Sequence, residues 1–168
     1  MPSTSVNTLA NAFAKTFDYH AAPGHLIRRA HQVAVSIFAE KTAAFDITPV
    51  QFAMLNALMD DPGEDQITLA GKVAFDAATS GAVIARLEAK GLLRRDADPK
   101  DKRRKLLTAT VEGEKVVIAM KAAVAEVQGQ IMQPLTAKEA QQLTALLGKL
   151  VAGHDETAKT GVKVGDIS

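Results

Sequence analysis

Apolar and polar residues alternate with the period of an α-helix along most of the chain. Between residues 25 and 45, apolar positions recur at spacings of three, four and seven, at Leu26, Ala30, Val33, Ile37 and Ala44. Pro23 and Gly24 precede this run and mark its start. The spacing predicts a long helix from His25 to about Phe45 that buries one broad face.

Three shorter helices are expected next, each bounded by residues that start or stop a helix. The pair Thr48-Pro49 favours a helix start, because the threonine oxygen accepts a first-turn N–H and the fixed φ of proline suits the first position. We expect helices at residues 49–59, 69–75 and 77–90, capped by Thr48, Thr68 and Asp76, with Gly91 as the C′ residue of the last. Two short helices joined by a tight polar junction form a helix-turn-helix unit.

The period changes after residue 91. Segments 92–95 and 105–110 have the pattern of short strands, and the residues from Asp96 to Asp101 between them favour a turn. The sequence therefore predicts a β-hairpin with a charged tip.

Two further helices are predicted after the hairpin. The first begins near Thr110 and stops before Pro134. The second opens at Thr136, where Glu139 stands at the spacing of a capping box, and is expected to end at Gly153.

This order of elements is that of a mainly α protein with a small β-hairpin wing, a winged helix-turn-helix domain between N-terminal and C-terminal dimerisation helices. The expected division is an N-terminal extension (1–22), a first dimerisation helix (23–47), the winged helix-turn-helix region (48–110), C-terminal dimerisation helices (111–153) and a flexible tail (154–168). A two-fold homodimer of this kind would place two recognition helices in successive major grooves of double-stranded DNA, about 10 base pairs apart.

Composition narrows the function classes. The chain has 168 residues, 47% of them hydrophobic, and no cysteine, which excludes a disulfide scaffold, a thiolate metal site and a cysteine nucleophile. No apolar run approaches the about 20 residues of a membrane helix, and the start of the chain does not resemble a secretory signal. We therefore expect a cytoplasmic protein of one domain with no membrane partner.

The charge is unevenly distributed. The formal net charge is only +1, yet residues 94–105 hold seven basic and three acidic side chains, so this segment carries +4 and the rest of the chain −3. A basic segment directly after a helix-turn-helix favours phosphate contact with DNA, whereas a basic run alone would be read as a solvated loop.

The residues around the hairpin carry a family resemblance. The sequences Arg86-Leu87-Glu88-Ala89-Lys90-Gly91-Leu92 and Asp98-Pro99-Lys100-Asp101-Lys102-Arg103-Arg104, followed by Leu107-Thr108 and Gly113, resemble the MarR family of bacterial transcriptional regulators. The resemblance covers about residues 26–150. It implies a dimeric DNA-binding protein whose wing-tip arginine, Arg103 here, enters the minor groove, and whose small aromatic acid ligands bind between the dimerisation helices and the winged domain.

The predicted DNA contacts lie on the polar residues of the helix-turn-helix and on the basic residues of the hairpin. Asp101 is close enough in sequence to restrain a basic neighbour, and the other cations would meet phosphate. The full set is Thr68, Ala77, Thr79, Ser80, Gly81, Ala82, Arg86, Arg94, Arg95, Lys100, Asp101, Lys102, Arg103 and Arg104. In the first turns of the recognition helix, the residues expected to be exposed are Ala77, Thr79, Ser80, Gly81 and Ala82. Gly81 and Ala82 replace the serine and arginine of many family members, which removes a strong guanine reader. Ordinary polarity at a helix start is the alternative for Thr79 and Ser80.

A second candidate site lies at the start of the first long helix. His25, Arg28 and Gln32 share one side of that helix, and with His20 they could offer a cationic wall to a carboxylate. Residues 23–32 also resemble the family subset that controls the breakdown of hydroxylated nicotinate. A solvent-facing polar stripe is the alternative. His25 and His31 project in different directions, so no metal site is expected.

These observations lead to one main hypothesis and two alternatives. The main hypothesis is a homodimeric repressor that leaves its operator when a small aromatic or pyridine carboxylate binds, without a cofactor. A DNA-compacting protein without sequence preference, or a helical protein-interaction module, would be the alternatives. No phosphate loop, nucleophile elbow or metalloprotease signature is present, so we do not expect an enzyme.

Overall fold

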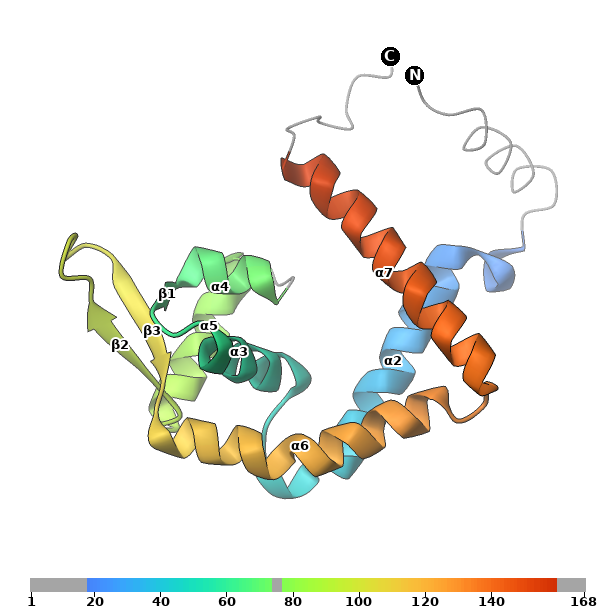
Figure 1. Ribbon diagram of the computed structural model, residues 1–168, viewed down its shortest axis with the longest axis horizontal. Coiled ribbons are helices and arrows are strands. Elements are labelled where there is room, and N and C mark those ends of the chain that lie inside the picture. Colours follow the sequence, from blue (N-terminus) through green and yellow to red (C-terminus); the bar gives the residue numbers. More distant parts are fainter. Residues whose placement is uncertain (1–17, 74–76, 160–168) are drawn as a thin grey trace, which may run out of the picture. The chain divides into compact units, whose positions relative to one another are not determined.

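The computed structural model describes residues 18–73 and 77–159 (Figure 1). The chain divides into two compact units, residues 1–128 and residues 129–168. The elements, in chain order, are η1 (Tyr19–Ala21), α2 (Pro23–Lys41), η2 (Ala43–Phe45), α3 (Pro49–Asp60), β1 (Glu64–Asp65), α4 (Gln66–Lys72), α5 (Ala77–Ala89), β2 (Leu93–Ala97), β3 (Lys105–Ala109), α6 (Val111–Met132) and α7 (Ala137–Lys159). The mainly helical fold with a small hairpin is as the sequence predicts.

The predicted first helix is confirmed but is shorter at its C-terminal end. Helix α2 stops at Lys41, and a short 3-10 turn, η2, follows before Asp46 adopts the left-handed conformation with φ 51°. The buried hydroxyl of Thr42 donates at 2.7 Å to the carbonyl oxygen of Phe38, which also accepts from the Thr42 amide at 2.9 Å.

Helix α3 begins as predicted, at a complete capping box. The amide of Gln51 donates to Oγ1 of Thr48 at 3.3 Å, and the amide of Thr48 donates to Oε1 of Gln51 at 3.0 Å. Pro49 occupies the first turn. Its missing N–H costs nothing there, because the first N–H groups of a helix have no partner within it.

Helix α4 begins three residues before the predicted position. Asp65, not Thr68, is its cap, because Oδ1 of Asp65 accepts a hydrogen bond from the amide of Thr68 at 3.0 Å. The prediction that Thr68 caps this helix is wrong, since an equally good acceptor lies three positions earlier. The predicted cap Asp76 lies outside the described residues.

The end of helix α5 confirms the predicted role of Gly91. Its φ is +71°, the amide of Gly91 donates to the carbonyl of Glu88 at 2.9 Å, and the amide of Leu92 donates to that of Leu87 at 3.0 Å. These two bonds form a Schellman motif. The motif turns the chain directly from the recognition helix into the hairpin.

Lys90, at the same helix end, reaches a distant loop. Its ammonium group donates to Oδ2 of Asp46 at 2.6 Å and to the Asp46 carbonyl oxygen. The ion pair lowers the pKa of Asp46 below its usual value, because Lys90 both hydrogen-bonds to the carboxylate and attracts it. Helix α5 is thereby attached to the segment that joins α2 to α3.

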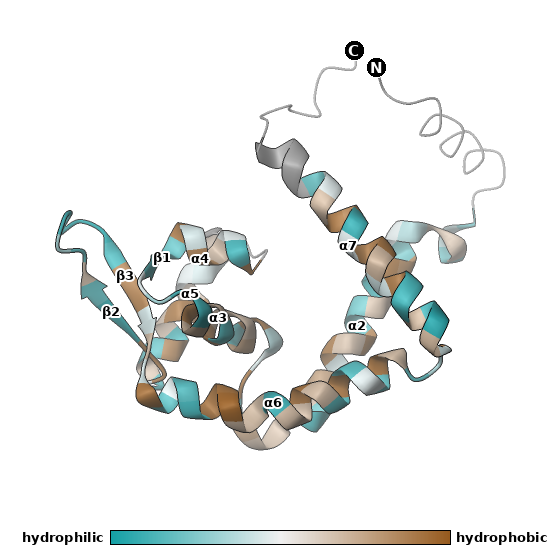
Figure 2. Cartoon of the chain, viewed as in Figure 1, coloured by the Kyte–Doolittle hydropathy of each residue, from teal (hydrophilic) through white to brown (hydrophobic). Residues whose placement is uncertain are grey.

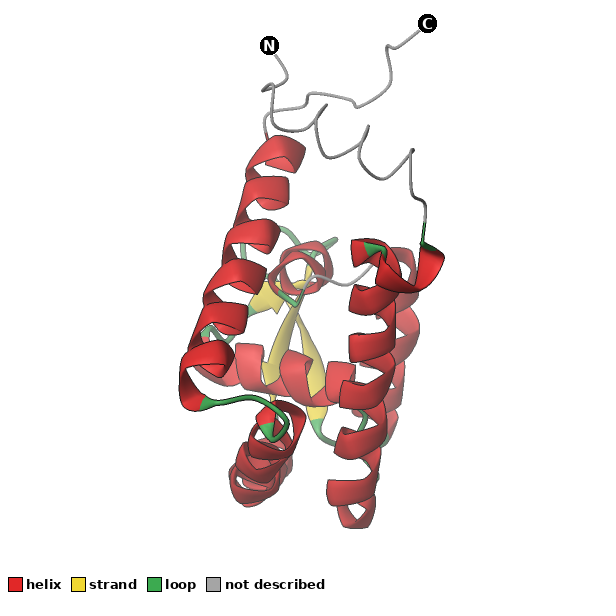
Figure 3. Ribbon diagram, turned by 90° about the vertical axis from the view of Figure 1, so that its right-hand side faces the viewer, coloured by secondary structure: helices red, strands yellow, loops and turns green. Residues whose placement is uncertain are grey.

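The three strands form one antiparallel sheet in the order β1-β3-β2. Figure 3 shows the strands of this sheet in yellow. In the predicted hairpin, Leu93 pairs with Ala109 and Ala97 with Lys105. Strand β1 was not expected, because two polar residues give no periodic signal. It pairs Asp65 with Leu106 and so attaches the start of α4 to the hairpin.

The core of the first unit lies between the helices and the inner end of the hairpin. The largest fully buried apolar side chains are Met54, Leu55, Leu58, Leu69, Ile84, Leu87, Val117, Met120 and Val127 from helices and Leu93 and Leu107 from strands. Figure 2 shows the outer end of the hairpin in the teal of hydrophilic residues. The hairpin is therefore anchored by its base, and its tip is polar.

Helix α6 starts with a close approach to the hairpin base. A Cβ atom on Gly113 would lie 2.1 Å from the carbonyl oxygen of Leu92. The helix begins next to Thr110 as predicted, and the amide of Gly113 donates to Oγ1 of Thr110 at 3.1 Å, which caps it. Only glycine allows this contact between helix and backbone.

The second unit contains α7, whose start is as predicted and whose end is not. The amide of Glu139 donates to Oγ1 of Thr136 at 3.3 Å, and the Thr136 amide donates to Oε2 of Glu139 at 2.8 Å, which confirms the capping box. The helix continues past Gly153 to Lys159, so the predicted end is wrong. The residues after Gly153 are compatible with a helix, and glycine alone does not stop one. Among the described residues, no helix is long and apolar enough to cross a membrane.

Candidate nucleic-acid interface

The first turns of helix α5 present fewer side chains to the outside than the sequence predicted. Thr79, Ala82 and Arg86 are exposed, and Gly81 is half-buried. Ser80 is 0% exposed, so the prediction that it is exposed is wrong. It lies one turn from Ile84 and two from Leu87, on the face of α5 that packs into the core. The side chain of Ala77 is outside the described part of the structure.

Gln66, the first residue of α4, contacts the start of α5, and sequence reasoning missed this contact. Its Nε2 atom donates to Oγ of Ser80 at 3.4 Å. A Cβ atom on Gly81 would lie 3.2 Å from the same Nε2 atom. Gly81 therefore makes room for a side chain of the first helix of the helix-turn-helix. Because the sequence placed the cap of this helix at Thr68, it gave no signal for Gln66.

At the tip of the hairpin, Arg103 is held at its base and free at its end. The amide of Arg103 donates to Oδ1 of Asp101 at 3.0 Å, and its Nε atom lies 3.4 Å from the same oxygen. The side chain of Arg103 is 94% exposed. The predicted restraint of a basic neighbour by Asp101 is confirmed for Arg103, which extends outward from the tip.

The other arginines of the basic segment are also paired with carboxylates. Arg94 lies 3.4 Å from Asp96, Arg95 lies 2.9 Å from Glu88, and Arg104 lies 2.6 Å from Asp65 and 3.7 Å from Asp98. In contrast, the exposed Lys100, Lys102 and Lys105 form no ion pair within the part of the chain that the structure describes. The uncompensated positive charge of the hairpin is therefore carried mainly by lysines.

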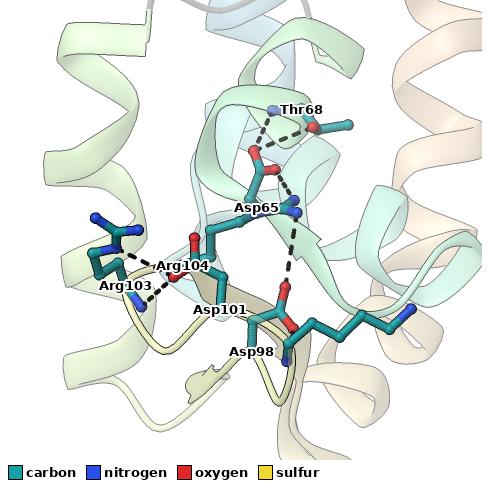
Figure 4. Close-up of polar contacts among 7 residues, drawn as sticks. Asp65, Thr68, Asp98, Asp101, Arg103 and Arg104 are labelled. Carbon is teal, nitrogen blue, oxygen red and sulfur yellow. Dashed lines mark hydrogen bonds and ion pairs between the residues drawn. The ribbon is translucent and has the colours of Figure 1, made fainter.

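Asp65 joins the helix-turn-helix to the hairpin (Figure 4). Its Oδ1 atom accepts from the amide of Thr68 at 3.0 Å and from the Thr68 hydroxyl at 3.1 Å, while Oδ2 accepts from Nη2 of Arg104 at 2.6 Å. These bonds lower the pKa of Asp65 below its ordinary value, and the bond from the Thr68 amide has the largest effect. The hydroxyl of Thr68, predicted to contact DNA, donates to Asp65 in this structure.

The second candidate site brings together three of its four predicted residues. The ring centroids of His20 and His25 are 5.4 Å apart, and Nη2 of Arg28 lies 3.4 Å from Nδ1 of His25. Gln32 instead accepts from Nη1 of Arg29 at 3.4 Å. Sequence reasoning missed Tyr19, whose ring lies 4.5 Å from that of His25. We call Tyr19, His20, His25 and Arg28 the aromatic-basic cluster. No three histidine, aspartate or glutamate side chains within residues 18–73 and 77–159 are placed to hold a metal ion.

Comparison with known proteins agrees with this geometry. The model of the MarR family matches residues 47–105, which span the helix-turn-helix and most of the hairpin. The transcriptional regulator HosA of Escherichia coli O111:H- is 32% identical over 126 residues, covering 72% of this chain and 93% of HosA. The HTH-type transcriptional repressor NicR of Pseudomonas putida is 31% identical over 142 residues, covering 84% of this chain and 89% of NicR.

Solved structures give the same result. The structure of Bordetella bronchiseptica BpsR, described as showing the mechanism by which 6-hydroxynicotinic acid regulates its DNA binding, is 32% identical. It superposes with a TM-score of 0.76 and covers 80% of this chain and 96% of its own. From the fold, the hairpin with its basic tip and these relatives, the chain belongs to the MarR family and is a transcriptional regulator.

Proposed function

We propose that this chain is a homodimeric repressor that binds a specific operator and is released from it by a small aromatic or pyridine carboxylate. The observation that carries the DNA-binding part is the arrangement of the hairpin. Exposed Arg103 extends from its tip beside three lysines without ion pairs among the described residues, and strand β1 attaches the hairpin to the helix-turn-helix. An arginine at such a tip suits a narrow minor groove, and lysines suit phosphates.

Exposed apolar side chains support a dimer. Helix α2 exposes Leu26, Ile27 and Val33, and helix α7, in the other unit, exposes Leu143, Leu146, Leu147, Leu150 and Val151. Several large apolar side chains exposed on one helix, as on α7, favour an interaction site. A second copy of the chain is the partner that we propose, in agreement with two-fold binding to DNA.

The aromatic-basic cluster supports the effector class. Arg28 offers a guanidinium group to a carboxylate, and the rings of Tyr19, His20 and His25 offer stacking partners for an aromatic ring. In Bordetella bronchiseptica BpsR, the compound described as regulating DNA binding is 6-hydroxynicotinic acid, which has a carboxylate and an aromatic ring. We therefore propose 6-hydroxynicotinic acid or a close analogue as the effector.

The test separates DNA binding from release. A duplex is selected from a random library with the full chain, and its affinity is compared with that of a random duplex at the same salt concentration. A regulator should prefer the selected duplex by about 10³ or more. Equal affinities would instead support the DNA-compacting protein, whose binding would rest on phosphate contacts alone.

Release is then measured by adding 6-hydroxynicotinic acid to the complex with the selected duplex. We expect weaker DNA binding, and an Arg28→Ala variant that binds DNA normally but no longer responds. Arg29→Ala is the matched control, because Arg29 lies on the same helix outside the cluster. Binding of the acid without any change in DNA affinity would refute the proposed release, because a ligand shifts an equilibrium only by its different affinities for the two states.

A further inference from the structure

Arg104 differs from the other basic residues of the hairpin in what it contacts. It lies at the base of the tip, and its guanidinium group bonds to Asp65 at 2.6 Å, across to the start of helix α4. Nη1 of the same group lies 3.7 Å from Asp98. Two carboxylates from two different segments therefore surround this side chain, which the sequence alone assigned to phosphate contact.

The partners of Arg104 are themselves fixed. Asp65 caps helix α4 through the amide of Thr68 and belongs to strand β1, which pairs with β3. Asp98 is mostly buried and accepts from the amide of Lys100 at 2.8 Å, and its own amide donates to the carbonyl of Arg104 at 3.1 Å. Arg104 thus connects a fixed point on the helix-turn-helix to a fixed point at the turn of the hairpin.

We propose that Arg104 is a positioning residue: its bond to Asp65 holds the hairpin against the first turn of α4 and so sets the distance between Arg103 and the recognition helix. This inference rests on the proposed DNA-binding function. Arg104 acts through its neighbours, Arg103 and the three lysines, which meet the DNA. Loss of the bond would keep the charges of those cations but would let the hairpin move in the free protein. The hairpin would then lose this freedom when it binds DNA, and the entropy cost would weaken binding.

The variant Asp65→Asn distinguishes positioning from simple electrostatics, because the two predict opposite signs. Removing a negative charge beside bound DNA strengthens binding if only charge matters. If the bond to Arg104 positions the hairpin, the same change weakens binding. Asparagine caps a helix about as well as aspartate, so the start of α4 is retained.

The experiment measures the affinity of the full chain for the selected duplex and its dependence on salt concentration. We expect Asp65→Asn and Arg104→Ala each to bind about fivefold more weakly, a change of about 1 kcal/mol. The slope of affinity against salt should stay unchanged, and the double variant should bind no more weakly than Arg104→Ala. Glu126→Gln is the matched control, because it also neutralises a carboxylate in an ion pair, 3.8 Å from Lys41 and outside the hairpin.

Two results would overturn the proposal. If Asp65→Asn binds as tightly as the wild type or more tightly, the pair does not position the hairpin. If Arg104→Ala lowers the salt slope by about one, Arg104 is itself a phosphate contact.

Amide hydrogen exchange over residues 98–104 provides a readout that does not need DNA. The amide of Arg104 donates to the carbonyl of Asp101 at 2.9 Å within this turn. Exchange in this segment should be faster in Asp65→Asn than in Glu126→Gln. Unchanged exchange would refute the positioning role even if the wild type bound no DNA, whereas faster exchange without DNA binding would refute only the proposed function.

Discussion

The contact between Gly113 and the hairpin base predicts a large effect from the addition of one methyl group. In Gly113→Ala, the new Cβ atom would lie 2.1 Å from the carbonyl oxygen of Leu92 and 3.4 Å from Cδ2 of Leu55. A carbon–oxygen contact needs about 3.3 Å, so the first turn of α6 must move by about 1 Å. The obstructing atom is backbone and cannot rotate away.

The size of the effect depends on the interactions that this movement breaks. The carbonyl of Leu92 also accepts from the amide of Thr110 at 3.0 Å, and a displaced helix start loses this bond. Overpacking contributes about 1–3 kcal/mol and the lost hydrogen bond about 1 kcal/mol. The better helix propensity of alanine returns at most about 1 kcal/mol. We expect Gly113→Ala to lower the free energy of unfolding by about 2 kcal/mol.

Urea unfolding, followed by circular dichroism at one protein concentration, measures this difference. A fixed concentration is needed because the stability of the proposed dimer would depend on it. Gly129→Ala is the matched control, because Gly129 lies in the same helix and a Cβ atom there meets nothing within 4 Å. It should be as stable as the wild type or up to about 1 kcal/mol more stable. Equal stability of the two variants would refute the close-contact argument.

Three further predictions concern the hairpin. Arg103→Ala should weaken binding to the selected duplex while leaving the proposed dimer, measured by sedimentation, intact; normal DNA affinity would contradict the role of the tip. Replacing Lys100, Lys102 and Lys105 together by glutamine should reduce the salt slope by about 3 for selected and random duplexes alike, and a loss confined to the selected duplex would contradict phosphate contact. Because the pKa of Asp65 is lowered from its ordinary 3.8, its bonds stabilise the fold above that pH and are lost as the pH falls through the lowered pKa. The stability difference between the wild type and Asp65→Asn, from urea midpoints at pH 7 and pH 2.5, should therefore shrink in acid.

The sequence predicted those elements whose signals are local. The helix start at Thr48 and the helix end at Gly91 each depend on a few neighbouring residues, and both are confirmed. The start of α4 was misplaced because two acceptors, Asp65 and Thr68, lie three residues apart and local rules do not rank them. The end of α7 was misplaced at Gly153 because the tolerance of a helix for glycine depends on the residues after it.

The parts of the site that could not be predicted depend on contacts between distant segments. The ion pair between Asp65 and Arg104 spans 39 residues, and the bond between Gln66 and Ser80 spans 14. Charge counting found the basic segment but could not show that its arginines are paired and its lysines, among the described residues, are not. Burial of Ser80 likewise depends on the packing of α5, which a polar residue at a helix start does not reveal.

The attachment of Lys90 to Asp46 has a mechanical consequence. Asp46 lies where the chain leaves α2 and turns, in a left-handed conformation, toward α3. The C-terminal end of α5 is therefore attached to this turn, since Lys90 bonds to both the side chain and the backbone of Asp46. A shift of this turn would therefore change the bonds that hold the end of α5.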